Sequence, residues 1–249
     1  MKQLYSNSLY GKSMQDHFLS IGLDFMQAQS AVKRIYPADK SRLDTSFHYE
    51  LFAALVNNAK PDSILEIGTH FGYFTEFLAK LAPKSKIVTL ELPENSSRGF
   101  LNDKQELMKK HYGRDVPKVS SNRLSNYKNV TQVWLDSTYL VDCQEIFNLI
   151  WIDGDRSFPV IAFDIINSLR ILSAEGIVCV DDIKLTSSNL FPFGVQTSKL
   201  SADEPIKTLT YLREIGLISF SLIPKRVRDM RPKKMGMIPK YIAVIKRVR

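Results

Sequence analysis

The chain has 249 residues, enough to bury a full core, and we expect one domain with an N-terminal elaboration. Its 44% hydrophobic and 24% charged residues are ordinary for a soluble globular protein. No apolar run approaches membrane-spanning length, residues 1–21 lack the apolar stretch of a secretory signal, and Cys143 and Cys179 have no metal-type spacing. We therefore expect a cytoplasmic protein with no membrane partner.

The net charge of +8 is concentrated near the C-terminus. Residues 225–249 contain ten Lys or Arg and one Asp, a net of +9, so the other 224 residues sum to −1. A basic patch of this kind can attract phosphate-bearing partners. It can also be a pair of solvated, charged strand ends that aids solubility, and the pattern alone leaves both interpretations open.

The N-terminal segment, residues 1–47, is predicted to be a helical cap. It is mostly polar, with an amphipathic stretch over residues 14–32 that fits one or two helices covering another surface. Pro37 breaks this region. The main domain is expected over residues 48–249 and begins with a helical pattern at residues 48–58.

Residues 63–72 are the stretch around which the chain is organised. A short apolar run stops at Gly68 and an amphipathic run begins after Gly72, which predicts a buried strand, a tight turn and a helix. Both glycines lack a Cβ and let a ligand approach the main chain. A dinucleotide-binding G-x-G-x-x-G would need glycine at His70. The pattern is instead E-x-G-x-x-x-G, and the carboxylate of Glu66 suits a cationic ligand better than a pyrophosphate.

The rest of the chain alternates strand and helix patterns, which is typical of a parallel α/β sheet. The last two strands have no helix between them and can pair antiparallel. A polar insertion at residues 93–128 is predicted to contain a helix near residues 101–112, and residues 183–203 are predicted to be a loop. The predicted strands are 86–92, 130–135, 147–153, 176–180, 217–223 and 241–248, and the predicted helices are 73–82, 137–145, 159–172 and 202–215.

Four of the predicted strands end in acidic residues. In an open α/β sheet, ligands bind outside the carboxyl ends of the strands. Carboxylates that converge on that edge repel one another unless a cation, or strong hydrogen-bond donors, share the cleft. The five residues are Glu91, Asp136, Asp153, Asp181 and Asp182.

Two blocks of the sequence resemble a known enzyme family. Residues 66–72 resemble the first motif of class I S-adenosylmethionine-dependent methyltransferases. Residues 150–158, Ile-Trp-Ile-Asp-Gly-Asp-Arg-Ser-Phe, and 176–182, Gly-Ile-Val-Cys-Val-Asp-Asp, resemble a subgroup with a D-G-D-H-S-Y pattern that is related to catechol-type O-methyltransferases. The resemblance implies a Rossmann-like α/β fold: a seven-stranded mixed sheet with an antiparallel C-terminal strand pair and an N-terminal helical cap.

The resemblance also implies S-adenosylmethionine as the cofactor. Glu91 would accept hydrogen bonds from the ribose hydroxyls. Glu66 would support the turn beneath the methionine part, Asp153 would lie near the sulfonium, and Asp136 with Ser137 would contact the adenine. The implied cofactor-binding residues are Glu66, Gly68, Thr69, Gly72, Glu91, Asp136, Ser137 and Asp153.

A divalent metal ion is a further implication of the resemblance. Asp153, Asp181 and Asp182 fall where catechol-type enzymes hold it, and oxygen-only ligands suit Mg²⁺ or Ca²⁺ rather than zinc. The chain departs from the subgroup at Arg156, where the pattern has histidine, and at Phe158, where it has tyrosine. Arg156 could bind an anionic substrate or pair with a neighbouring carboxylate. The implied catalytic residues are Asp153, Asp181 and Arg156.

The predicted reaction is methyl transfer from S-adenosylmethionine to a hydroxyl of a small molecule, with Mg²⁺ as a second cofactor. One alternative is an RNA or DNA methyltransferase that uses the basic C-terminal region, although this region lacks aromatic residues for base stacking apart from Tyr241. The other is a cofactor-binding protein without activity, which the change at Arg156 suggests. A homo-oligomer is also expected.

Overall fold

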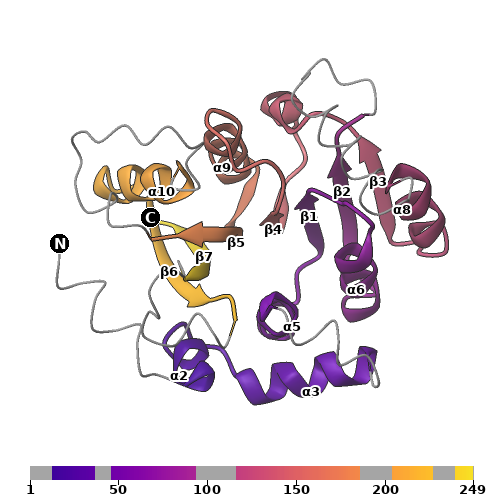
Figure 1. Ribbon diagram of the computed structural model, residues 1–249, viewed down its shortest axis with the longest axis horizontal. Helices are drawn as coiled ribbons and strands as arrows, with labels where there is room; N and C mark the ends of the chain where they lie inside the picture. The colour runs from indigo at the N-terminus through magenta and orange to yellow at the C-terminus, as the bar shows by residue number, and fades with distance from the viewer. Residues whose placement is uncertain (1–12, 37–45, 94–115, 186–203, 227–238, 249) are drawn as a thin grey trace.

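The computed structural model describes residues 13–36, 46–93, 116–185, 204–226 and 239–248. These residues form a seven-stranded sheet in the order β3-β2-β1-β4-β5-β7-β6, with helices on both faces (Figure 1). The prediction of a seven-stranded mixed α/β sheet is therefore confirmed. The strands are β1 (Ser63–Ile67), β2 (Lys86–Glu91), β3 (Val130–Trp134), β4 (Phe147–Ile152), β5 (Leu172–Lys184), β6 (Ile218–Pro224) and β7 (Lys240–Arg247).

The first five strands pair in parallel, and the last two close the sheet antiparallel. β1 lies between β2 and β4, so the chain runs outward on one side of β1 and then crosses to the other side. This reversal creates a crevice at the carboxyl ends of β1 and β4. β7 is an interior strand, because it pairs with β5 on one side and β6 on the other.

The two faces of the sheet carry separate apolar layers. Alternate strand residues point to opposite faces, so Ile64 packs with the N-terminal helices while Leu65 packs with the later ones. Figure 1 shows α9 and α10 over one face and α5 and α6 over the other. The helices are α2 (Met14–Leu19), α3 (Phe25–Ile35), α5 (His48–Ala59), α6 (Tyr73–Leu81), α8 (Val116–Leu124), η1 (Ser137–Asp142), α9 (Val160–Arg170) and α10 (Glu204–Glu214).

The predicted cap region contains two helices, α2 and α3, in agreement with the amphipathic pattern. Ser13 begins α2 with a capping box, and Asp24 caps the start of α3 by accepting a hydrogen bond from the Gln27 N–H. Fully buried Phe18 belongs to the same apolar cluster as Phe52 of α5. The cap therefore shares its core with the sheet, and the division at residue 47 stays a prediction. No described helix has the length and apolarity needed to cross a membrane.

The structure differs from the prediction in three elements. α8 was not predicted, since it lies within the polar insertion. β5 begins at Leu172 rather than Gly176, because Leu172 already pairs with Phe147 of β4, and it extends to Lys184, so the predicted loop at 183–203 begins within a strand. The segment after Asp136 is a short 3₁₀ helix rather than a longer helix. The predicted helix near residues 101–112 and most of the predicted loop at 183–203 lie outside the described residues.

Candidate functional site

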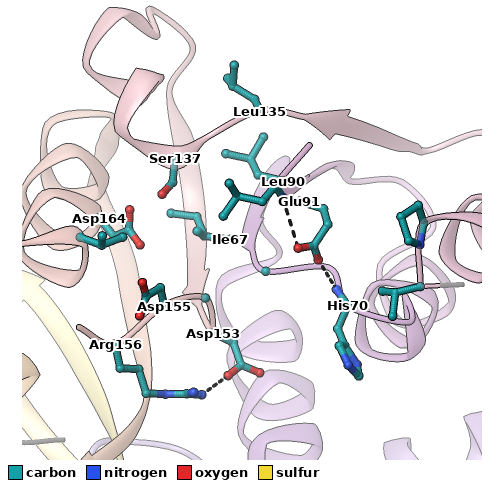
Figure 2. Close-up of a pocket in the computed structure, with 16 residues that line it drawn as sticks. Ile67, His70, Leu90, Glu91, Leu135, Ser137, Asp153, Asp155, Arg156 and Asp164 are labelled. Atoms are coloured by element: carbon teal, nitrogen blue, oxygen red, sulfur yellow. Dashed lines mark hydrogen bonds and ion pairs between the residues drawn. The ribbon is translucent and has the colours of Figure 1, made fainter. Parts of the chain in front are cut away.

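A pocket opens at the carboxyl ends of β1, β2 and β4, at the predicted acidic edge. Figure 2 shows side chains from several strand ends pointing into it. Five predicted residues line it: Gly68, Glu91, Ser137, Asp153 and Arg156. Other polar lining residues are His70, Asp155 and Asp164.

The turn after β1 requires glycine at Gly68. Its φ is +104°, and a Cβ there would lie 2.8 Å from the Asp153 carbonyl oxygen. The Gly68 N–H donates to the Leu90 carbonyl at 2.9 Å, and the Asp153 N–H donates to the Ile67 carbonyl at 2.9 Å. The turn is thus fixed between β2 and β4, and its backbone forms the pocket floor.

Glu91 is held at the pocket edge by two backbone N–H groups. His70, with φ +50°, donates its N–H to Glu91 Oε2 at 2.5 Å, and the Leu92 N–H donates to Oε1 at 3.2 Å. Figure 2 shows the Glu91 carboxylate directed at the His70 backbone. Two N–H donors favour an ionised carboxylate, which can accept further hydrogen bonds from a ligand.

Glu66 does not line the pocket but supports the turn from below. Its buried Oε2 accepts hydrogen bonds from Thr75 Oγ1 at 2.5 Å and from Thr89 Oγ1 at 2.7 Å. Thr89 has one hydroxyl proton, so the 2.7 Å contact between Thr69 Oγ1 and Thr89 Oγ1 must have Thr69 as donor. Burial raises the pKa of Glu66 to about 7, although the hydrogen bonds from Thr75 and Thr89 lower it in part.

Ser137 lines the pocket, whereas Asp136 caps the 3₁₀ helix η1. The Asp136 carboxylate accepts from the Thr138 N–H at 2.9 Å and from Thr138 Oγ1 at 2.8 Å. This cap points the start of η1 at the pocket. Asp136 is not among the lining residues, and the adenine contact predicted for it stays a prediction.

Asp153 and Arg156 form an ion pair on the other side of the pocket from Glu91 (Figure 2). Arg156 Nη2 also lies 3.4 Å from Asp181 Oδ2 and 3.5 Å from Asp182 Oδ2. Of the two interpretations of Arg156, pairing with neighbouring carboxylates is therefore present in the structure. Its side chain remains 29% exposed, so the guanidinium can also meet a ligand.

Asp153, Arg156, Asp181 and Asp182 form a charged cluster. Two lysines, one after β6 and one at the start of β7, complete it. Lys225 Nζ contacts Asp181 Oδ2 and lies 2.8 Å from Asp182 Oδ1. Lys240 Nζ lies 2.8 Å from Asp182 Oδ2. These contacts were not predicted, because the sequence shows only that residues 225–249 are basic. Lys225 and Lys240 thus turn inward to carboxylates, whereas Lys246 of β7 is exposed.

The charges of Asp182 and Lys225 stabilise each other. Burial alone would raise the pKa of Asp182, but the charges of Arg156 and Lys225 outweigh it and hold that pKa far below its usual range. Burial alone would lower the pKa of Lys225, but Asp181 and Asp182 outweigh it and raise that pKa. Lys225 is therefore a cation at every pH near neutrality.

His48 lies beside this cluster as a neutral ring. Burial lowers the pKa of His48 to about 4, although the nearby Asp181 charge opposes this shift. The ring packs against Tyr49 and Phe74, with centroids 4.3 and 4.9 Å away, and stacks on Trp151. A base with so low a pKa removes protons poorly at pH 7, so His48 is better suited to shaping the site.

The predicted metal ligands do not fit Mg²⁺ as they are arranged. The three carboxylates, those of Asp153, Asp181 and Asp182, are already paired with three cations. Mg²⁺ would need near-octahedral oxygen ligands and would stand among these positive groups. Across the residues that the structure describes, no group of three or more His, Cys, Asp or Glu side chains could hold a metal ion.

α8, missed in the sequence, forms a wall of the pocket through Val116 and Pro117. Arg123 connects this helix to the turn between β1 and α6. Its guanidinium carbon lies 3.7 Å from the centre of the Tyr73 ring, and its Nε donates to the Phe71 carbonyl at 3.0 Å. This helix lies in the polar insertion at residues 93–128, where the sequence pattern did not locate it.

Residues 65–183 match the model of a family described as a methyltransferase domain. Similar solved structures include cofactor-bound Rv0187 from MTB, at 19% identity and TM-score 0.56, covering 89% of this chain and 88% of that chain. The SAH-bound methyltransferase PaMTH1 of Podospora anserina is 18% identical with TM-score 0.55, over 90% and 88% of the two chains. The O-methyltransferase TomG of Streptomyces achromogenes, involved in tomaymycin synthesis and solved with SAM, is 16% identical with TM-score 0.54, over 96% and 97%.

These likenesses show that the chain has the fold of these proteins over nearly its whole length. No curated protein matches the sequence. The match over residues 65–183 independently covers β4, α9 and most of β5, where the acidic cluster lies. The comparisons therefore show a match to a methyltransferase-domain family over residues 65–183 and the fold of these proteins over most of the chain.

Proposed function

We propose that the methyl donor is S-adenosylmethionine and that it binds along the turn after β1. The observation that carries this proposal is the Glu91 carboxylate, held beside a turn in which only glycine fits at Gly68. A carboxylate fixed in this way can accept two hydrogen bonds from a cis-diol such as the ribose. Similar structures solved with SAM or SAH support the choice of cofactor.

The remaining cofactor roles follow the positions of the lining residues. Ser137 would contact the adenine, with Asp136 positioning it through the cap of η1. The backbone of Gly68 and Thr69 would lie beneath the methionine part, with Glu66 and Gly72 supporting the turn. Asp153 would stand near the sulfonium, where a negative charge stabilises the cationic donor.

The acceptor is proposed to be the hydroxyl of a small molecule, bound at the Asp153–Arg156 side of the pocket. TomG, an O-methyltransferase, has a similar fold and supports oxygen as the acceptor atom. Because the sulfonium donor already carries a good leaving group, the main task of the site is to align the hydroxyl with the methyl group. Arg156 would orient an acceptor that carries negative charge.

The Asp181 carboxylate can then accept a hydrogen bond from the acceptor hydroxyl. Its Oδ2 is held by Lys225, whereas its buried Oδ1 has no hydrogen-bond partner within the described residues. A buried carboxylate oxygen with a spare lone pair can accept a proton from a hydroxyl that is being methylated. The proposed reaction needs no step through a metal ion.

Three described basic residues of the C-terminal region bond to groups of the protein itself. Lys225 and Lys240 pair with aspartates, and Arg247 Nη2 donates to the Leu172 carbonyl at 2.7 Å. A small molecule is therefore the acceptor class that we propose.

Calorimetry with S-adenosylmethionine, with SAH and with NAD tests the proposal on the full-length protein. We expect one binding site for each of the first two ligands and none for NAD, since the turn lacks the dinucleotide glycine pattern. Methyl transfer would then be measured with a set of small hydroxyl compounds, with structured RNA as the comparison. Binding of NAD without SAH, or methylation of the RNA alone, would contradict the proposal.

A further inference from the structure

Lys225 is built into the interior at the end of β6 rather than lying on the surface. The residue is 7% exposed. Its backbone N–H donates to the Lys240 carbonyl at 2.9 Å, and its carbonyl accepts from the Phe47 N–H at 2.8 Å. The backbone of this lysine is thus fixed on both sides, and its ammonium lies in one buried place, in contact with Asp181 and Asp182.

That place lies between two carboxylates that a regular strand would separate. Successive strand residues point to opposite faces, so Asp181 and Asp182 should face apart. The pairing of β5 with β7 is irregular between Val180 and Ile183, and Asp182 adopts φ +57°. This conformation is unfavourable for a residue with a Cβ and persists only when its surroundings stabilise it. It lets both aspartates contact the Lys225 ammonium.

We infer that Lys225 is the resident cation of this site and takes the place of a divalent metal ion. Its ammonium neutralises Asp181 and Asp182 from one side, while Arg156 and Lys240 complete the charge balance. The ammonium binds Oδ2 of Asp181 and leaves Oδ1 of the same carboxylate able to accept a hydrogen bond from the acceptor hydroxyl. Lys225 is a positioning residue, and its role toward the acceptor rests on the proposed methyltransferase function.

The choice between a lysine and a metal ion has a direct chemical consequence. An ammonium offers three hydrogen-bond donors and one positive charge, whereas Mg²⁺ brings two charges and six ligand positions. Removal of Lys225 would leave the three carboxylates with only Arg156 and Lys240, and would open space between Asp181 and Asp182. Such a variant should acquire the cation site that the natural chain lacks.

The test compares Mn²⁺ binding, followed by electron paramagnetic resonance, in the full-length protein and in Lys225→Met. We expect the substitution to tighten Mn²⁺ binding by about 10-fold or more, because one neighbouring charge shifts an ionic equilibrium by roughly 1–3 log units. Mg²⁺ should raise the thermal midpoint of Lys225→Met and leave that of the unmodified protein unchanged. The matched control is Lys246→Met, an exposed lysine of β7, which should behave as the unmodified protein does.

A second variant keeps the test decisive if Lys225→Met fails to fold. Lys225→Met combined with Asp182→Asn removes one charge of each sign, so it should fold without metal and show no gain in Mn²⁺ binding. Tight Mn²⁺ binding by the unmodified protein, or no gain in a folded Lys225→Met, would overturn the inference. SAH calorimetry on the same proteins separates the two proposals. If the unmodified protein does not bind SAH, the proposed cofactor is wrong, but the inference about Lys225 is still tested by Mn²⁺ binding.

Discussion

The two sides of the pocket are built from very different lengths of chain. The proposed cofactor side brings together the turn after β1 and the end of β2, so Gly68 and Glu91 lie on consecutive strand ends. The acidic side joins Asp181 to Lys225, which lies 44 residues further along. The first side is fixed by backbone contacts of the Gly68 turn with β2 and with the end of β4, whereas the second depends on a charge balance that exists only in the complete sheet.

The largest effect is expected from Gly68→Ala, which tests the local geometry of the cofactor side. The new Cβ would clash with the Asp153 carbonyl and would need a φ that favours glycine. Strain of roughly 1–3 kcal/mol and overpacking of roughly 1–3 kcal/mol should together lower the free energy of unfolding, and SAH binding should be lost.

The matched control for this variant is Gly22→Ala. Gly22 has φ +75° but nothing within 4 Å of the added Cβ, so it carries the backbone strain without the clash. Urea unfolding of both variants isolates the contribution of the clash. Equal losses of stability in the two variants would show that the contact between Gly68 and Asp153 is unimportant.

Glu66 should make the cofactor side sensitive to pH. Its folded-state pKa of about 7 exceeds the ordinary glutamate value of 4.5, so the stability it contributes is fully present below about pH 4.5 and is lost as the pH rises to about 7. The loss approaches about 3 kcal/mol at 1.36 kcal/mol per pKa unit. Glu66→Gln removes this titration and should gain stability relative to the unmodified protein across that range.

Urea unfolding at several pH values measures this difference between the two proteins. Burial also raises the pKa of Glu50 to about 7, but Glu50 titrates in both proteins and cancels in the comparison. A difference that stays constant from pH 4.5 to pH 8 would mean that Glu66 titrates alike in the folded and unfolded chains.

Glu91→Ala should have the smallest effect, and it should fall on binding alone. We expect SAH affinity to weaken by roughly 1–3 kcal/mol, the usual cost of leaving buried polar partners unsatisfied. The fold should persist, since Glu91 ends its strand. Glu145→Ala is the control, because that glutamate pairs with Lys86 at the opposite end of β2. Unchanged SAH affinity with a collapsed thermal midpoint would make Glu91 a structural residue.

The sequence allowed the cofactor side to be predicted more completely than the acidic side. Strand periodicity located β1 and β2, and the glycine spacing located the turn between β1 and α6. The aspartates at the ends of β4 and β5 were also predictable, because polar residues that follow parallel strands meet at one edge. The roles assigned to these residues stay predictions.

The partners of the aspartates could not be predicted. No motif distinguishes Lys225 and Lys240 from the other basic residues among the ten in residues 225–249. Their inward direction depends on the register of β6 with β7 and on the irregular pairing of β5 at Asp182. Register and irregular pairing arise from contacts between distant strands, which a local pattern does not contain.

The interior position of β7 has a consequence for the order in which the protein is synthesised. The turn after β1 and its Glu91 anchor need only the strands up to β4, which are synthesised before Lys225 and Lys240. The aspartates of β5 must wait for Lys225 and Lys240, which are made later. During that interval they are either solvated or paired with other cations, so the acceptor side becomes complete only when β7 inserts between β5 and β6.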